Sequence, residues 1–365
     1  MIQRQARKFE LWEVSGDAYD RGFAYGSRYK RLISTLLQSH YVFYDRYFKI
    51  SPAQMRKRAS KCCSNIESYS PEIYEEVRGT ADGAALAEDD LAVLVAFCEV
   101  YYSTISGGCT AFAVSPPATA PGEACSGMNN DEALDPWVNG DCAVVVRFRR
   151  KSGPDVMSYL WAGVPGMIGL NTSGISVCTT LIQTEQVLEA GVPHSVIMRE
   201  VLQQSNLENA VEAIERASRA VSLNYLIADE TGRACNVEAT PSGCDKWFAK
   251  NGVLVHTNHI LSRNLAFRKD MVLASGISFG LDTEFRYGRM SDLVESNAGN
   301  VTLTRMFDFL RDHSNHPSSI CRHPNPAEPL ATRSRTMDSL VMVPAKREMW
   351  IAHGNPCENE FLKYA

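Results

Sequence analysis

A cysteine that directly follows two glycines is the first feature of this sequence that could do chemistry. Residues 105–112 read ISGGCTAF, so Cys109 comes after Gly107 and Gly108. A lone cysteine is more often a small buried hydrophobe than a nucleophile. Glycine, however, accepts backbone conformations that other residues avoid, so the Gly108 carbonyl can take a position that the thiol reaches. We interpret the Gly108–Cys109 peptide bond as a candidate for attack by the Cys109 thiol.

A polar segment, GMNND at residues 127–131, follows Cys109 at a distance typical of the second strand of a hairpin. Asn, Asp and Gly are turn residues, so a solvated turn is the simplest interpretation. A hairpin would instead return Asn129 and Asp131 to the side of Cys109. A carboxylate in that position would stabilise a cationic partner and set the positions of protons.

Two histidine-rich segments raise the question of a metal site. They are VHTNHI (255–260) and RDHSNHPSSICRH (311–323), which contain His256, His259, His313, His316, Cys321 and His323. Zinc sites that are recognisable from sequence have tighter paired spacing, and this chain contains no CxxC. We therefore expect no metal.

Two further residues in these segments suit acyl chemistry. Asn258, at the end of a predicted strand, offers an amide N–H that can stabilise an oxyanion. Arg322 would by default be a surface arginine. Because it follows the apolar, strand-like SIC, it could instead direct a fixed cation into a cleft, where it would hold a carboxylate or a thiolate.

The segments that must position these residues are helix-rich before residue 105. FELWEV (9–14) predicts a short strand, and residues 15–48 predict a long amphipathic helix. Ser70-Pro71, followed by acidic residues, predicts the start of another helix.

After Cys109 the pattern becomes strand-rich. Strands are predicted in CTAFAVS, with Cys109 as the first residue, and in CAVVVRF (142–148), DVMSYLWA (155–162) and GISVCTTLI (174–182). Residues 194–218 predict helix with a break near Ser205-Asn206, and hairpins are predicted around Thr231-Gly232 and Pro344–Arg347. This order of helices, strands, helices and strands favours α+β layers over a repeating βαβ sheet.

The composition and charge of the chain limit the classes of binding partner that we expect. The chain has 365 residues, a net charge of -5 and no long basic tract, so we expect neither nucleic acid nor a membrane as a partner. The 11 cysteines are an odd number at irregular spacings, and the N-terminus has no apolar segment of signal-peptide length. We expect a reducing, cytoplasmic-type compartment.

Cys109, GMNND, HTNH and SICR, in this order, resemble the acyl-coenzyme A:6-aminopenicillanic acid acyltransferase (isopenicillin N acyltransferase) family of cysteine N-terminal-nucleophile hydrolases. DAYDRGFAYGSRYK, YEEVRGTADGAAL, GLNTSGISV and GVPHSVIMREVL extend the resemblance over most of the chain. It implies an α+β fold, the four-layer αββα sandwich of N-terminal-nucleophile hydrolases, with no cofactor or metal. Residues 1–108 would be a helix-rich small subunit and residues 109–365 a catalytic large subunit, which stay associated as one compact domain of unknown oligomeric state.

The resemblance also implies roles for single residues. Cys109 matches the nucleophile that cleavage after Gly108 exposes, Asp131 the aspartate that contacts it, Asn258 the oxyanion-hole asparagine, and Arg322 the arginine near the nucleophile.

The chain departs from the family pattern at two places. Met128 stands where bile salt hydrolases carry an arginine. Thr179-Thr180 lie where relatives often carry an asparagine that supports the oxyanion hole. Thr180 and Asn129 are therefore our candidates for a second donor or a supporting contact.

The expected activity is self-processing followed by acyl transfer or hydrolysis through a Cys109 thioester. The substrate would be a small amide or an acyl-CoA, and water or an amine would accept the acyl group. One alternative is an acyl-CoA-dependent β-lactam (6-aminopenicillanate or isopenicillin N) acyltransferase. A second is a catalytically inactive binding protein of the same fold, which would need the loss of the nucleophile or of Asn258.

Overall fold

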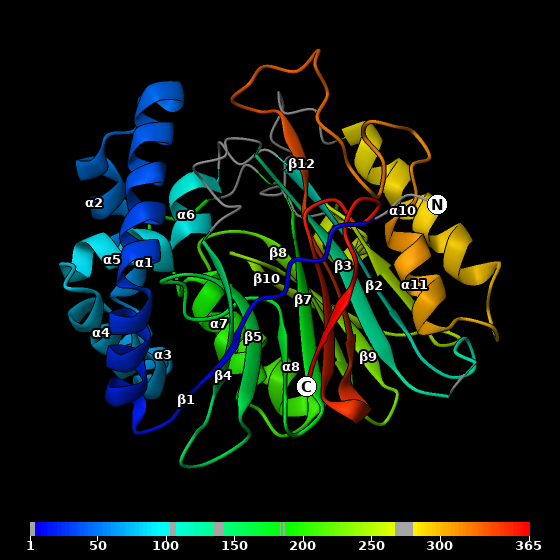
Figure 1. The fold of residues 1–365 in the computed structure, drawn as a ribbon, viewed down its shortest axis with the longest axis horizontal. Helices are drawn as coiled ribbons and strands as arrows, with labels where there is room; N and C mark the ends of the chain where they lie inside the picture. The colour runs from blue at the N-terminus through cyan, green and yellow to red at the C-terminus, as the bar shows by residue number, and fades with distance from the viewer. Residues whose placement is uncertain are drawn as a thin grey trace.

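Two β-sheets packed face to face form the centre of the molecule, and helices cover both outer faces (Figure 1). A computed structural model describes residues 4–102, 107–120, 122–133, 142–182, 184, 187–266 and 280–365. The order helix, sheet, sheet, helix confirms the four-layer αββα sandwich expected from the sequence.

The first sheet has the strand order β1-β4-β5-β6-β7-β8-β9-β10. The strands are β1 (Leu11–Val14), β4 (Ala143–Phe148), β5 (Val156–Trp161), β6 (Gly169–Asn171), β7 (Ile175–Leu181), β8 (Leu223–Asp229), β9 (Ala234–Thr240) and β10 (Gly243–Phe248). β1 pairs with β4 in parallel, and the other neighbours pair antiparallel. The strands β5, β8 and β9 are buried along their whole length because this sheet is covered on both faces.

The second sheet is antiparallel and has the order β11-β2-β3-β12-β13-β14. Its strands are β11 (Val253–His256), β2 (Gly107–Val114), β3 (Cys125–Ala133), β12 (Ser334–Val343), β13 (Glu348–His353) and β14 (Leu362–Tyr364). The hairpins predicted at Thr231-Gly232 and at Pro344–Arg347 are confirmed as the β8–β9 and β12–β13 connections.

The helices fall into three groups. The N-terminal group is α1 (Ala18–Phe48), α2 (Pro52–Cys63), α3 (Ile66–Tyr69), α4 (Pro71–Ala84), α5 (Glu88–Val95) and α6 (Phe97–Tyr101). α7 (His194–Leu202) and α8 (Leu207–Glu215) pack on the first sheet, and the predicted break between them is confirmed, with Asn206 capping α8. α9 (Arg263–Ala266) contacts β10, whereas α10 (Gly280–Glu295) and α11 (Leu303–Leu310) cover the second sheet.

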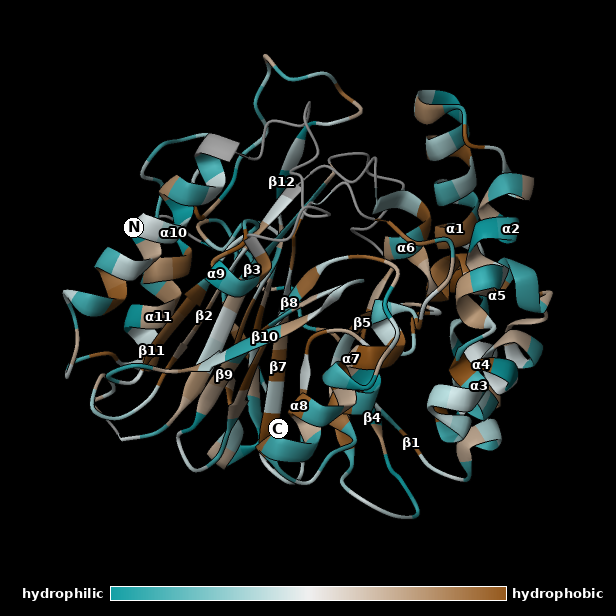
Figure 2. Ribbon diagram, turned by 180° about the vertical axis from the view of Figure 1, so that it is seen from behind, coloured by the Kyte–Doolittle hydropathy of each residue, from teal (hydrophilic) through white to brown (hydrophobic). Residues whose placement is uncertain are grey.

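Hydropathy follows these layers. Figure 2 shows hydrophobic residues on the central strands β2 and β7 and hydrophilic residues on the outer helix α2. The buried apolar residues form one large cluster that joins the N-terminal helices to the first sheet, and a smaller one between the second sheet and α10 and α11. Among the described residues, no helix is both long enough and apolar enough to span a membrane.

The helices α1 and α4 approach each other unusually closely because both carry glycines one turn apart at the contact. Gly22 and Gly26 of α1 face Gly79 and Gly83 of α4. A Cβ built on Gly26 would lie 2.2 Å from the Thr80 carbonyl oxygen, which is far inside van der Waals contact. Any side chain at these positions would therefore push the two helices apart.

We predict that Gly26→Ala lowers stability, although alanine is the better helix former. Separating packed elements costs about 1–3 kcal/mol, which exceeds the gain in helix propensity of about 1 kcal/mol. Gly288→Ala in α10 is the matched control, because a Cβ there has no atom within 4 Å. Thermal unfolding should show a lower Tm for the first variant and an equal or higher Tm for the second. A common shift of both variants would contradict the close-contact argument.

Candidate active site

Cys109 lies near the beginning of β2 and faces the strand β3. The strand begins at Gly107, two residues earlier than the sequence predicted, so Cys109 is not its first residue. Across the β2–β3 ladder the partner of Cys109 is Asn130, and its Oδ1 lies 3.8 Å from Cys109 Sγ. The predicted hairpin is confirmed, and GMNND is strand rather than a solvated turn.

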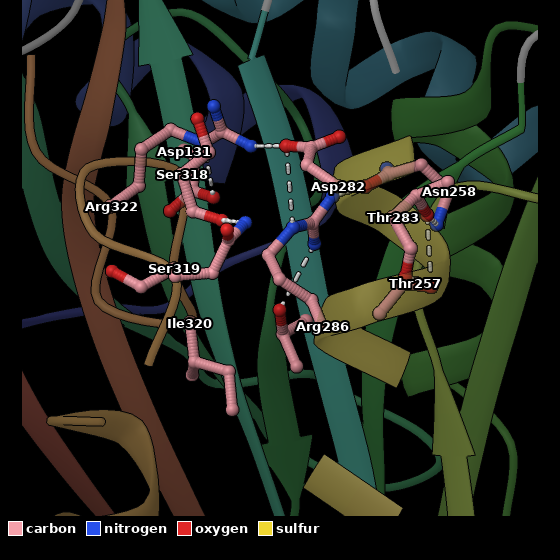
Figure 3. A network of polar contacts seen from close by, with 12 residues as sticks. Asp131, Thr257, Asn258, Asp282, Thr283, Arg286, Ser318, Ser319, Ile320 and Arg322 are labelled. Carbon is pink, nitrogen blue, oxygen red and sulfur yellow. Dashed lines mark hydrogen bonds and ion pairs between the residues drawn. The ribbon is translucent and has the colours of Figure 1, made fainter. Parts of the chain in front are cut away.

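The side chain of Asn258 touches the backbone of the candidate nucleophile. The Cys109 backbone N–H donates to Asn258 Oδ1 at 2.9 Å, while Asn258 Nδ2 donates to the Leu181 carbonyl oxygen at 2.9 Å. The Asn258 backbone N–H donates to Thr283 Oγ1 at 2.8 Å, which anchors the residue to α10 (Figure 3). Asn258 thereby connects β2, β7 and α10 at one point.

Arg286 of α10 is a site residue that the sequence analysis missed. Its side chain is 0% exposed, and Nη1 donates to the Cys109 carbonyl oxygen at 2.5 Å and to Thr110 Oγ1 at 3.0 Å. Nη2 donates to Asn258 Oδ1 at 2.8 Å. No local pattern marks this arginine, which stands in LDTEFRYGRMSD (281–292) among several other charged residues.

Arg286 also explains the glycine at position 108. A Cβ built there would lie 2.8 Å from Arg286 Nη2 and 3.3 Å from Asn258 Oδ1. The absence of a side chain at Gly108 thus allows the guanidinium to reach the backbone of Cys109.

A chain of buried charges of alternating sign leads from the second sheet to Arg286. Asp131 is 2% exposed, and its Oδ2 lies 3.3 Å from Nε of Arg322, which is 6% exposed. Arg322 also pairs with Asp282, whose Oδ2 lies 3.7 Å from Arg286 Nε (Figure 3). Thr336 Oγ1 donates to the other Asp131 oxygen at 2.7 Å.

The route by which Arg322 enters the site differs from the prediction. The SIC residues before it form bends in the long connection between α11 and β12, not a strand. Hydrogen bonds hold this loop instead: the Arg322 backbone N–H donates to Thr336 Oγ1 at 2.9 Å, and the Thr336 N–H donates to the Arg322 carbonyl oxygen at 3.0 Å.

The Cys109 thiol opens onto a mainly apolar cavity of about 70 Å³. Its apolar walls include Phe97 and Cys98 of α6, Trp161, Leu181 and Leu223. Burial, followed by the negative charges of Glu132 and Asp131, raises the pKa of the Cys109 thiol to about 12. The thiol therefore keeps its proton at neutral pH and needs a base to become a nucleophile.

Glu132 is a second residue that the sequence analysis missed. It pairs with Gly107 in the β2–β3 ladder, is half-buried and lines the same cavity as Cys109. Burial, together with the neighbouring charges of Asp338 and Asp131, raises the pKa of this carboxyl group to about 8. The site thus contains a carboxylic acid that remains protonated near neutral pH.

Asn129 and Thr180 make their hydrogen bonds away from Cys109. Asn129 Nδ2 donates to the Leu310 and Ile320 carbonyl oxygens, at 2.9 and 2.8 Å, on the α11 side of the sheet. Thr180 Oγ1 lies 2.7 Å from His256 Nδ1. The backbone N–H of the next residue, Leu181, hydrogen-bonds the Cys109 sulfur and offsets a small part of the rise in its pKa that burial causes.

The two histidine-rich segments have different surroundings. His256 is buried between Thr180 and Glu238, whose Oε1 lies 2.9 Å from His256 Nε2. Among the described residues, the side chains that could together hold a metal ion are His313, Cys321, His323 and Cys357.

Known proteins resemble this chain over most of its length. The sequence profile of the acyl-coenzyme A:6-aminopenicillanic acid acyl-transferase family matches residues 122–358. The acyl-coenzyme A:6-aminopenicillanic-acid-acyltransferase 40 kDa form of Emericella nidulans is 22% identical over 344 residues, which cover 93% of this chain and 91% of the relative. The chain is therefore an enzyme of the N-terminal-nucleophile type that transfers or hydrolyses acyl groups. It belongs to the acyl-coenzyme A:6-aminopenicillanic acid acyl-transferase family.

Two solved structures are also similar. A mutant conjugated bile acid hydrolase from Clostridium perfringens has a TM-score of 0.49 at 16% identity, covering 70% of this chain and 96% of its own. Penicillin V acylase from Agrobacterium tumefaciens has a TM-score of 0.47 at 13% identity, covering 67% of this chain and 83% of its own.

We predict that Glu132→Gln changes how stability depends on pH. The carboxyl pKa rises from its ordinary value of 4.5 to about 8 on folding, so the native state retains a proton that the unfolded chain releases. Stability from this group is complete below pH 4.5 and is lost as the pH rises toward 8. Glutamine does not titrate, so the Tm of the variant relative to the parent should increase between pH 5 and pH 8. A pH-independent difference in Tm would show that Glu132 is already ionised.

Proposed function

We propose that this enzyme processes itself at the Gly108–Cys109 bond and then carries acyl groups on the Cys109 thiol. One observation carries the proposal. The nitrogen that cleavage would free, the Cys109 backbone N, is held by Asn258 Oδ1 at 2.9 Å beside the thiol and its cavity. Nucleophile, future α-amine and amide side chain therefore meet at one point.

Processing begins with attack of Cys109 Sγ on the Gly108 carbonyl carbon. The C–N bond breaks, the nitrogen takes up a proton, and the acyl group moves from nitrogen to sulfur. Water then hydrolyses the thioester, which leaves a Gly108 carboxylate and a Cys109 with a free thiol and a free α-amine.

The charges around Cys109 suit an α-amine better than a thiolate. Negative charge on Glu132 and Asp131 raises the pKa of the thiol. Near neutral pH Glu132 is protonated, and the Asp131 carboxylate stabilises an ammonium group in the same position. A free α-amine has a reference pKa of about 7.7–8.0, so it can accept the thiol proton near neutral pH. Asp131 thereby sets the protonation of the amine. Burial raises the pKa of Asp131, and the charge of Arg322 opposes this rise and orients the carboxylate.

The oxyanion of the tetrahedral intermediate needs donors next to Cys109. Asn258 Nδ2 and the Leu181 backbone N–H are the two we propose. Both donors already form hydrogen bonds beside the cavity. Asn258 Nδ2 donates to the Leu181 carbonyl oxygen, and the Leu181 N–H donates to the Cys109 sulfur. The backbone donor takes the place for which the sequence analysis proposed Thr180 or Asn129.

The cavity supports a small acyl substrate with an apolar acyl group. Its walls are aromatic and aliphatic, and α6 from the segment before Cys109 contributes Phe97 and Cys98. This contribution supports our proposal that residues 1–108 stay bound to residues 109–365 after cleavage. We retain a cytoplasmic-type location as a proposal, supported by the odd number of 11 cysteines.

An acyl-CoA-dependent β-lactam acyltransferase is the second candidate. It is favoured by the relative from Emericella nidulans, which aligns over 93% of this chain. The two candidates share every step on Cys109 and differ only in the acyl donor and the acceptor.

Autocleavage is the first prediction from this mechanism. Purified protein should give two bands on a denaturing gel, and N-terminal sequencing of the larger fragment should begin at Cys109. The two fragments should co-elute under native conditions. Cys109→Ala should remain one intact chain, with Cys244→Ser, a half-buried cysteine on β10, as a control that still cleaves. Cleavage of Cys109→Ala at the same bond would reveal another protease.

Asn258→Ala should depress the turnover of processed enzyme by about 10²–10³, the usual cost of losing one oxyanion donor. Steady-state rates per cleaved molecule measure this effect, and circular dichroism checks that the fold is intact. Unchanged turnover would show that Asn258 does not stabilise the oxyanion and that backbone N–H donors alone do so.

A covalent thioester should be detectable directly. Mixing with an activated acyl ester and quenching in acid should add one acyl mass to the fragment that starts at Cys109. A nucleophilic amine should then divert the product from free acid to amide, because a thioester reacts readily with amines. Turnover that persists after alkylation of Cys109 would refute the mechanism and leave the β-lactam alternative without a nucleophile as well.

A further inference from the structure

Two histidines and two cysteines from separate parts of the chain converge next to the loop that carries Arg322. His313, Cys321 and His323 lie in the connection between α11 and β12, and Cys357 lies between β13 and β14. One side-chain atom from each, a ring nitrogen or a sulfur, lies within 4.8 Å of the other three.

Four of the six distances between these atoms are close to the edges of a tetrahedron, and the other two are within 4.8 Å. The two sulfurs of Cys321 and Cys357 lie 3.7 Å apart, and Nε2 of His313 and Nε2 of His323 lie 3.1 Å apart. His323 Nε2 lies 3.7 Å from the Cys321 sulfur and 3.5 Å from the Cys357 sulfur.

Tetrahedral zinc demands nearly these values. With Zn–S bonds of about 2.3 Å and Zn–N bonds of about 2.0–2.1 Å, the edges are about 3.8 Å between sulfurs, about 3.3 Å between nitrogens and about 3.6 Å between sulfur and nitrogen. We propose that His313, Cys321, His323 and Cys357 bind one zinc ion in a structural Cys₂His₂ site. Four protein ligands complete the coordination of zinc and leave no open position, so the site supplies structure rather than chemistry.

Neighbouring groups support the ligands as they do in zinc sites. Asn355 Nδ2 donates to the Cys321 sulfur at 3.5 Å and to the Arg322 carbonyl oxygen at 2.7 Å. The Cys321 backbone N–H donates to the Asp312 carbonyl oxygen at 3.0 Å. Such contacts orient ligands and stabilise thiolate sulfur.

A disulfide between Cys321 and Cys357 is the competing use of the two thiols. It would need a sulfur–sulfur distance of about 2.05 Å, whereas the sulfurs lie 3.7 Å apart. A disulfide would also leave unexplained why the two imidazoles direct their Nε2 atoms at each other and toward the sulfurs. Zinc accounts for all four side chains.

The site has a consequence for the catalytic centre, because Cys321 and His323 flank Arg322. A bound ion would hold the backbone of Arg322 from both sides and would tie it to the C-terminal segment through Cys357. Zinc would thereby keep the Arg322 guanidinium against Asp131, 3.3 Å away. The ion acts as a positioning element. The sequence had pointed to His313, Cys321 and His323 as possible metal ligands but not to the distant Cys357, and it led us to expect no metal.

The first test is the metal content of the full-length protein, purified without a polyhistidine tag or chelator. Elemental analysis should give one zinc per chain, and Cys357→Ser should reduce this to a small fraction. Cys244→Ser, another half-buried cysteine, is the matched control and should retain the zinc. A protein that contains no zinc and takes up none from one equivalent of zinc sulfate overturns the proposal.

A histidine pair sharpens the ligand assignment. His313 and His316 are both exposed and lie in the same loop, yet only His313 belongs to the cluster. His313→Ala should weaken zinc binding in a competition titration, whereas His316→Ala should not. The reverse result overturns the ligand set.

Two further measurements do not depend on enzyme activity. Cobalt(II) in place of zinc should give the intense visible absorption of tetrahedral thiolate coordination, and zinc removal should lower the Tm of the parent but not of Cys357→Ser. A Cys321–Cys357 disulfide, found by peptide mass analysis of protein alkylated before digestion, overturns the zinc site in favour of a covalent link.

Discussion

The chain of buried charges Asp131–Arg322–Asp282–Arg286 joins the elements on which the site depends. It links β3, the loop before β12 and α10, and it ends on the backbone of Cys109. Removing charges from water is costly, and the cost is offset only when each charge has an opposite partner at close range. The charges alternate in sign along this chain, so each side chain has an oppositely charged neighbour that fixes its position.

This dependence makes the network a positioning device rather than a source of net stability. Loss of one partner from a buried pair typically costs about 3–5 kcal/mol, because the remaining charge stays buried and unpaired. Arg286 also has a steric role, because its guanidinium fills the space that a side chain at Gly108 would need. The close packing of α10 against β2 therefore requires a glycine immediately before Cys109.

The charges around the pocket favour an amine rather than a thiolate as the starting state for catalysis. Carboxyl groups at Asp131 and Glu132 next to a buried thiol work against a thiolate, as the raised pKa of Cys109 indicates. The Asp131 carboxylate also favours a positive charge on a neighbouring nitrogen, whereas Glu132 is protonated and uncharged near neutral pH. An enzyme that uses the α-amine of its own nucleophile as the base benefits from this arrangement, whereas one that relies on a preformed thiolate does not.

Local sequence determined most of the secondary structure and the α+β class, because apolar periodicity, helix starts and hairpin turns depend on neighbouring residues. The order of the four layers was implied by the family resemblance. The long helix α1, the break at Asn206 and both predicted hairpins follow from such signals. Cys109, Asp131, Asn258 and Arg322 were proposed from their resemblance to a family, and their catalytic roles stay predictions. Tertiary structure decided the rest. Arg286 and Glu132 became site residues only when α10 and β3 packed against β2, and Cys357 met His313, Cys321 and His323 only when the C-terminal strands closed the second sheet. No spacing in the chain records the contact of Arg286 with Cys109 or of Cys357 with the other three side chains, because these residues are distant in sequence and become adjacent only after the layers have formed.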